Sequence, residues 1–285
     1  MVHADTGATM THRRIPTGMA VVSACAAALA GLVSPAAAPA TGVTADGHPH
    51  VGRHFGYAAM GDSITVGIGT SDWAVDASGA LVRIDHRWTY PERAGVRSFG
   101  VNGSCVAGAV CGADPADPDM KAERWFPEVM GDLHRTPRTV VTHIGINDLV
   151  VHHTAEEVVA GLRHLRQEGR ALGIRVVFGT IGPSPADAPS WTITQPERIR
   201  VNEWIRDTQS TYVDYARALE GPDGWLRPEF ESSMRDVHYN DAGAAAMAAQ
   251  LREWVTHDAA TRPRGRAFAL RERPARPGAS YGGPA

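Results

Sequence analysis

Short apolar segments alternate along this chain with longer amphipathic ones, and this alternation constrains the fold more than any other feature. The apolar segments span residues 55–60, 96–101, 138–145, 174–182 and 211–216. The amphipathic segments span residues 154–173, 195–210 and 240–259. Strands that are apolar throughout are buried on both faces, as in parallel sheets covered by helices. The pattern therefore predicts an α/β fold with a parallel sheet between two helical layers.

The helical segments carry recognisable start and stop signals. Thr154 with Glu157 three residues later forms a capping box, and Gly173 ends the same segment. Either Asn240 or Asp241 starts the last helix, because both side chains can cap backbone N–H groups.

The first 40 residues have the features of an export signal. Arg13 and Arg14 precede an apolar stretch from Met19 to Val33, and Ala38-Pro39-Ala40 matches a cleavage pattern. We therefore expect residues 1–40 to be a signal peptide. A membrane anchor is one alternative, and a lipoprotein anchored at Cys25, which follows Val22-Ser23-Ala24, is another.

The rest of the chain is expected to form one domain with two flexible flanks. Residues 41–54 should be flexible, residues 55–259 globular, and residues 260–285, rich in Pro, Arg and Gly, disordered. An apolar content of 43% is enough for one core. The net charge of −3 gives no reason to expect a nucleic acid or an anionic membrane surface as partner.

Two cysteines remain after removal of the signal. Cys105 and Cys111 form an even pair, which in an exported protein predicts a disulfide bond. Two free buried thiols are the alternative. His48, His50 and His54 lie in a polar segment without cysteine or acidic partners, so we expect no metal site and no cofactor.

Polar residues follow the expected strands. Ser63 follows the first strand, Gly100 ends the second, Asn147 follows the third, and His238 precedes the last helix. Because the carboxyl ends of parallel strands share one edge of the sheet, where ligands bind, we expect these residues to meet there.

This set of groups suits acyl transfer to a serine. His238 can take the proton of Ser63 and return it to a leaving group. The backbone N–H groups of Ser63 and Gly100 and the amide of Asn147 could stabilise a developing oxyanion.

The same residues resemble the GDSL, or SGNH, hydrolase family over residues 55–257. Its four blocks match as Gly61-Asp62-Ser63-Ile64, Gly100, Gly145-Ile146-Asn147-Asp148 and His238. The resemblance implies a three-layer αβα sandwich around a parallel sheet of about five strands in flavodoxin-like order. It also implies Ser63 as nucleophile, His238 as base, and Ser63, Gly100 and Asn147 as oxyanion donors.

One position departs from the family pattern. The family usually carries an aspartate three residues before the histidine, where this chain has Arg235, while Asp236 lies two residues before His238. Either Asp236 or a backbone carbonyl orients the imidazole. We favour Asp236 because a carboxylate stabilises the imidazolium more strongly.

The resemblance predicts an exported serine ester hydrolase of the carboxylic-ester type. It would act as a monomer on a small-molecule, lipid or glycan ester, without stable membrane insertion. Two alternatives stay open: an O-acyltransferase or acetyl esterase acting on a cell-wall or plant glycan, and a catalytically impaired binding protein on the same scaffold.

Overall fold

The computed structural model describes residues 56–85, 88–107, 122, 126, 127, 130, 137–188 and 193–262. The expected signal peptide, the segment 41–54, Cys111 and residues 263–285 lie outside these ranges. None of the helices within them is long and apolar enough to cross a membrane.

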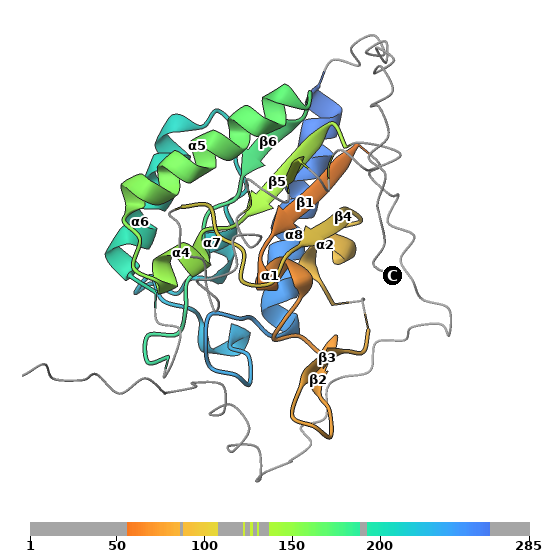
Figure 1. The fold of residues 1–285 in the computed structure, drawn as a ribbon, viewed down its shortest axis with the longest axis vertical. Helices are drawn as coiled ribbons and strands as arrows, with labels where there is room; N and C mark the ends of the chain where they lie inside the picture. The colour runs from red at the N-terminus through yellow and green to blue at the C-terminus, as the bar shows by residue number, and fades with distance from the viewer. Residues whose placement is uncertain are drawn as a thin grey trace, which may run out of the picture.

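Four parallel strands form the main sheet: β1 (Tyr57–Gly61), β4 (Arg97–Gly100), β5 (Thr139–His143) and β6 (Arg175–Phe178). Their spatial order is β4-β1-β5-β6, as Figure 1 shows. The first sheet strand therefore lies between the second and the third, which confirms the flavodoxin-like order. The order reverses between β1 and β5, and ligands bind outside such a point in this class of sheet.

The strand expected over residues 211–216 is reduced to a single parallel bridge between Gly179 and Val213. The chain turns directly into α7 (Tyr215–Leu219), because the Asp214 side chain accepts the N–H of Arg217 and caps that helix. The sheet of the described residues thus has four strands, and a single bridge marks the position of the fifth.

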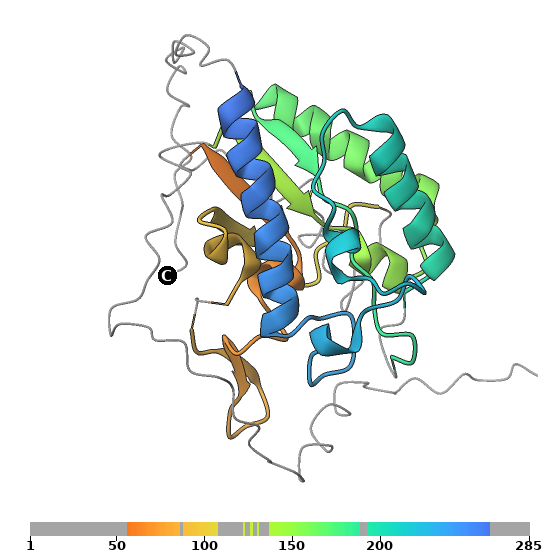
Figure 2. The same cartoon turned by 180° about the vertical axis from the view of Figure 1, so that it is seen from behind.

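Helices cover both faces of the sheet, which confirms the three-layer arrangement. One layer contains α4 (Ile146–Val150), α5 (Ala155–Ala171) and α6 (Gln195–Thr208), and α5 packs against β6 and α6. The other layer contains α2 (Tyr90–Arg93), α7 and α8 (Asp241–Thr261), with α8 packed against α2 and α7 (Figure 2). All residues of β1 and β5 are buried between these layers.

The helix ends follow the local sequence signals. Thr154 and Glu157 form the expected capping box at the start of α5, and Gly173 adopts a left-handed conformation with φ 71° just after its end. Asn240 is the N-cap of α8, where its side chain accepts the N–H groups of Ala242 and Gly243. The choice between Asn240 and Asp241 is therefore settled in favour of Asn240.

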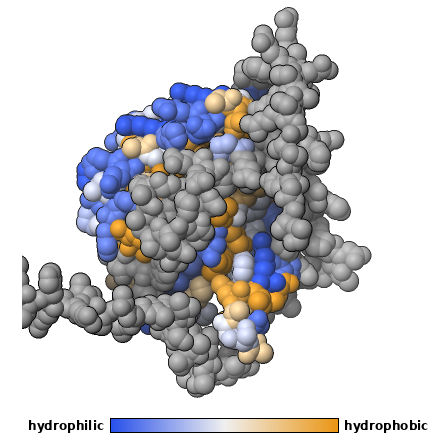
Figure 3. Space-filling model, in the orientation of Figure 1, coloured by the Kyte–Doolittle hydropathy of each residue, from blue (hydrophilic) through white to orange (hydrophobic). Residues whose placement is uncertain are grey.

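A small antiparallel hairpin, which the sequence analysis did not predict, extends from the main body. Its strands are β2 (Trp73–Val75) and β3 (Leu81–Arg83). Val75, Leu81 and the following Ile84 are exposed, and apolar surface gathers at this hairpin in Figure 3. The remaining elements are α1 (Ser63–Val66) and the short 3-10 helix η2 (Pro228–Phe230).

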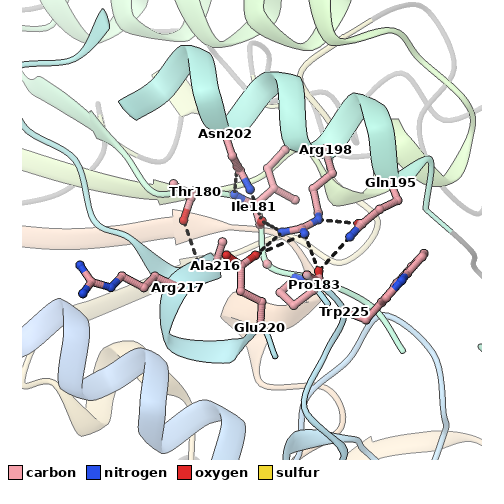
Figure 4. Close-up of polar contacts among 12 residues, drawn as sticks. Thr180, Ile181, Pro183, Gln195, Arg198, Asn202, Ala216, Arg217, Glu220 and Trp225 are labelled. Atoms are coloured by element: carbon pink, nitrogen blue, oxygen red, sulfur yellow. Dashed lines mark hydrogen bonds and ion pairs between the residues drawn. The ribbon is translucent and has the colours of Figure 1, made fainter. Parts of the chain in front are cut away.

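A buried arginine forms hydrogen bonds to the segment that follows β6. Arg198 of α6 is 1% exposed and donates to the Ile181 carbonyl and to the Glu220 carboxylate, as Figure 4 shows. It also donates to the Gly224 carbonyl. Burial lowers the pKa of Arg198, and the negative charge of Glu220 opposes that shift. This one side chain therefore joins three segments that are distant in sequence.

We predict that Arg198→Met lowers the free energy of unfolding by about 3 kcal/mol, because Glu220 and two carbonyls lose a buried donor. Arg200→Met is the matched control, since Arg200 pairs with Glu156 and Glu197 at the surface. The control should lose less than about 1 kcal/mol. Urea unfolding measures both values, and equal losses would contradict a special contribution from Arg198.

Candidate active site

A tight junction between β1 and α1 presents Ser63. A Cβ atom on Gly61 would lie 2.1 Å from the His143 carbonyl oxygen and 2.3 Å from the Thr65 hydroxyl. Only glycine fits where β1 meets β5 so closely. Ser63 then begins α1 two residues after this contact, at the carboxyl end of the strand.

Asp62 shapes the junction from inside. It is fully buried and is the N-cap of α1, with Oδ1 accepting the N–H of Ile64 at 3.0 Å. Its Oδ2 atom has no hydrogen-bond partner in the described part of the protein. Burial raises the pKa of Asp62 to about 7, although the Ile64 N–H and the charge of His238 act in the opposite direction.

Ser63, His238 and Asp236 form a connected chain of polar groups. The Nε2 atom of His238 lies 2.8 Å from the Ser63 hydroxyl, and Nδ1 lies 2.9 Å from Oδ1 of Asp236. Burial alone would raise the pKa of Asp236, but the hydrogen bonds and charge of His238 outweigh it and hold that pKa below its usual value. An ionised Asp236 can only accept, so Nδ1 carries the proton and Nε2 faces the serine with its lone pair.

The two-residue spacing between Asp236 and His238 works because of the local backbone. Arg235 adopts a left-handed conformation with φ 51°, and its side chain points to Asp187 at 2.6 Å. Oδ1 of Asp236 also accepts the backbone N–H of His238 at 2.9 Å. With this backbone the Asp236 carboxylate reaches the imidazole of His238. The structure therefore places Asp236 rather than a carbonyl beside Nδ1.

Asn147 follows β5, whereas Ser63 follows β1, and the strand order reverses between these two strands. It belongs to α4 directly after β5, and it is 4% exposed. Its Nδ2 atom donates to the Ser104 carbonyl at 2.8 Å. Because an amide nitrogen carries two hydrogens, the second N–H stays available for another acceptor.

Gly100, which the sequence analysis expected as an oxyanion donor, is the last residue of β4. It lies within β4, and a Cβ atom there would meet the Val66 nitrogen at 2.8 Å and the Asp62 carbonyl oxygen at 3.0 Å. The next residue, Val101, donates its N–H to the Gly61 carbonyl of β1. Successive N–H groups of a strand point to opposite sides, so the N–H of Gly100 points away from β1. Its glycine is needed for the close packing of α1.

Gly103 lies three residues after Gly100, and the sequence analysis did not single it out. It has φ 74° and lies in a turn closed by the hydrogen bond from Ser104 N–H to the Val101 carbonyl. Its N–H has no acceptor among the described residues. The carbonyl of the following residue, Ser104, accepts a hydrogen bond from the Asn147 side-chain amide. The signal was the Asn102-Gly103 pair after the strand, since Asn-Gly favours turns that need a positive φ.

Asp148 ties this turn to α4. It is fully buried, and its carboxylate accepts the N–H groups of Val106 at 3.1 Å and Ala107 at 2.6 Å. Burial raises the pKa of Asp148 to about 6, while those two N–H groups lower it. The sequence analysis included Asp148 in a motif without a role, and the structure shows it holding the segment that carries Ser104.

The part of the chain that the structure describes contains no cluster of three His, Cys, Asp or Glu side chains suited to a metal ion. Cys105 is fully buried, whereas its expected partner Cys111 lies outside the described residues, so the disulfide stays a prediction.

A sequence-family model for GDSL-like lipases and acylhydrolases matches residues 59–246. The chain belongs to this family. The matched region includes Ser63, Asn147, Asp236 and His238. No curated protein matches the chain in sequence.

Solved structures share the fold at low identity. The native aryl esterase of M. smegmatis is 17% identical, with 70% of this chain and 98% of that chain covered and a TM-score of 0.52. A carbohydrate acetylesterase family member from Sinorhizobium meliloti is 20% identical, with 70% and 97% covered and a TM-score of 0.53. Est24, a carbohydrate acetylesterase from the same organism, is 14% identical, with 72% and 98% covered and a TM-score of 0.52.

The buried Asp62 generates a testable pH dependence. Its pKa is about 7 in the folded protein, whereas the ordinary value expected in the unfolded chain is 3.8. Between these values the unfolded chain is ionised while the folded protein keeps the proton, so the contribution of Asp62 makes the fold less stable as pH rises and levels off above about 7. Asp62→Asn cannot ionise and keeps an oxygen for Ile64. Its stability relative to the wild type should therefore increase between about pH 4 and 7.

Urea unfolding of both proteins at several pH values measures this difference. A difference that stays constant across the range would show that Asp62 does not titrate there.

Proposed function

We propose that this protein is a serine ester hydrolase that works through an acyl-serine intermediate. Two hydrogen bonds carry the proposal. Ser63 Oγ lies 2.8 Å from His238 Nε2, and His238 Nδ1 lies 2.9 Å from Asp236 Oδ1. A hydroxyl with a base in reach, and a base oriented by a carboxylate, is the arrangement that activates a serine. This arrangement weighs against the alternative of a catalytically impaired binding protein on the same scaffold.

The reaction begins with attack of the Ser63 oxygen on the ester carbonyl while its proton passes to Nε2 of His238. The imidazolium, stabilised by Asp236, then gives that proton to the departing alcohol. In the second half a water molecule loses a proton to Nε2 and attacks the acyl-serine, and the acid leaves as Ser63 regains its proton.

Three donors are proposed for the oxyanion of each tetrahedral intermediate. They are the backbone N–H groups of Ser63 and Gly103 and the free N–H of Asn147. Gly103 replaces Gly100 in this proposal because its N–H has no acceptor among the described residues and its segment is bonded to Asn147 through Ser104. Donors that are already fixed stabilise the developing charge without reorganisation.

The substrate class is proposed from the solved structures of similar fold. Two of them are named as carbohydrate acetylesterases and one as an aryl esterase. We therefore propose esters of short acyl groups, such as acetate. Export of the mature enzyme is proposed from the pattern of residues 1–40 alone.

Hydrolysis of p-nitrophenyl acetate tests the central proposal. Ser63→Ala should abolish turnover, and Asp236→Asn should lower kcat by about 10³- to 10⁴-fold because the imidazole loses the carboxylate that fixes its tautomer and stabilises the imidazolium. Asp187→Asn, which changes a surface carboxylate bound to Arg235, is the matched control and should stay within about twofold of the wild type. Wild-type turnover in Ser63→Ala would refute the proposal.

Asp148 provides a separate prediction about the oxyanion donors. Asp148→Asn turns an NH₂ group toward the N–H groups of Val106 or Ala107, which releases the segment that positions Ser104 and Asn147. We expect kcat to fall by about tenfold or more with little change in KM, because the donors act on the transition state. In an Asn147→Ala background the same change should have almost no further effect. Additive losses would show that Asp148 acts independently of Asn147.

A further inference from the structure

A cavity of about 440 Å³ lies at the end of the sheet opposite Ser63. It is a hollow open to solvent on one side and bordered by the last turns of α5, the start of β6 and the segment that follows α6, with Arg166, Arg175 and Gln209 among its lining residues. Its size is within the range of pockets for small ligands. Because Arg175 begins β6 while the catalytic groups follow the strand ends, this cavity is distinct from the proposed active site.

The cavity exists because the fifth strand is so short. Only Val213 forms a bridge to the sheet, opposite Gly179, so the edge of β6 at Val176 and Val177 faces the cavity instead of another strand. Side chains from α5 and from the segment Gln209–Thr211 form the remaining walls.

Three guanidinium groups line the cavity, and no carboxylate is among its described lining residues. Arg175 already pairs with Asp258 at 2.7 Å. Arg166 donates to the Gln209 amide oxygen at 2.5 Å and stacks over the Phe178 ring at 4.1 Å. Arg170, one turn further along α5, is exposed.

The partly buried charge of Arg166 lacks the compensation that the chain provides elsewhere. Arg206 is likewise partly buried, but Asp214 lies 2.8 Å from it, and that carboxylate raises the pKa of Arg206. Burial lowers the pKa of Arg166, and the positive charge of Arg170 lowers it further. Among the described residues, Arg166 and Arg170 form no ion pair with a carboxylate.

We propose that this cavity binds an oxyanion, a phosphate or carboxylate group, between the guanidinium groups of Arg166 and Arg170. Planar guanidinium groups bind such anions through paired hydrogen bonds. Gln209 and Phe178 hold the Arg166 fork in one orientation before the ligand arrives. Thr211 adds a donor, because its oxygen accepts the N–H of Trp254 at 2.9 Å and its own hydrogen remains free to turn toward the ligand.

Isothermal titration of the whole protein with sodium phosphate and with sodium citrate, each against sodium chloride at equal ionic strength, tests this proposal. Saturable binding of at least one anion is expected, and the comparison of the two distinguishes a phosphate site from a carboxylate site. Arg170→Gln should weaken the binding by about tenfold, because a charged donor is lost.

Arg163→Gln is the matched control. Arg163 is exposed on the same helix, lies over the Trp204 ring at 5.2 Å and does not line the cavity. This variant should bind the anion within about twofold of the wild type. Turnover of p-nitrophenyl acetate should be unchanged in both variants, which shows that they are folded and separates this test from that of the active site.

Two results would overturn the proposal. One is the absence of saturable binding for both anions at matched ionic strength. The other is equal weakening by Arg163→Gln and Arg170→Gln, which would mean that the anions respond to the general charge of α5 rather than to a site.

Discussion

Burial of the sheet on both faces is the constraint on which the rest of this structure depends. With all residues of β1 and β5 enclosed by helices, the groups proposed for catalysis have to come from the segments that leave the strands. Parallel strands all end at the same edge, so Ser63, Asn147 and His238 converge there although up to 175 residues separate them. The contact of Gly61 with the His143 carbonyl shows how tightly this edge is packed.

Three aspartates at this edge show that one side-chain type performs three tasks when its surroundings differ. Asp62 is buried, and one of its oxygens has no partner in the described part of the protein; burial raises its pKa to about 7. Asp148 receives two backbone N–H groups and holds a loop. Asp236 faces an imidazole, which keeps it ionised. Buried carboxylates of this kind reduce stability unless they are compensated, and the compensation here lies in the groups that shape the proposed site.

Away from this edge, the buried and partly buried charges belong to arginines. Arg198 is buried, and its charge and hydrogen bonds are matched by Glu220 and by carbonyls. Arg166 is partly buried, and its partners among the described residues are the Gln209 amide oxygen and the Phe178 ring. The difference follows from topology, because the short contact at Val213 leaves the β6 edge open where a full strand would have closed it.

The sequence by itself predicted the fold class, the sheet order through the family resemblance, the α5 cap, and the candidates Ser63, Asn147 and His238. These follow from local periodicity and short motifs, which act over a few residues. The proposal of Gly103 in place of Gly100 needed the tertiary structure, because the direction of a backbone N–H depends on strand register and not on residue type. The tertiary structure also decided for Asp236, because the left-handed Arg235 re-aims the carboxylate. The short fifth strand has the same origin: Val213 forms one bridge to Gly179, and α7, capped by Asp214, begins directly after it.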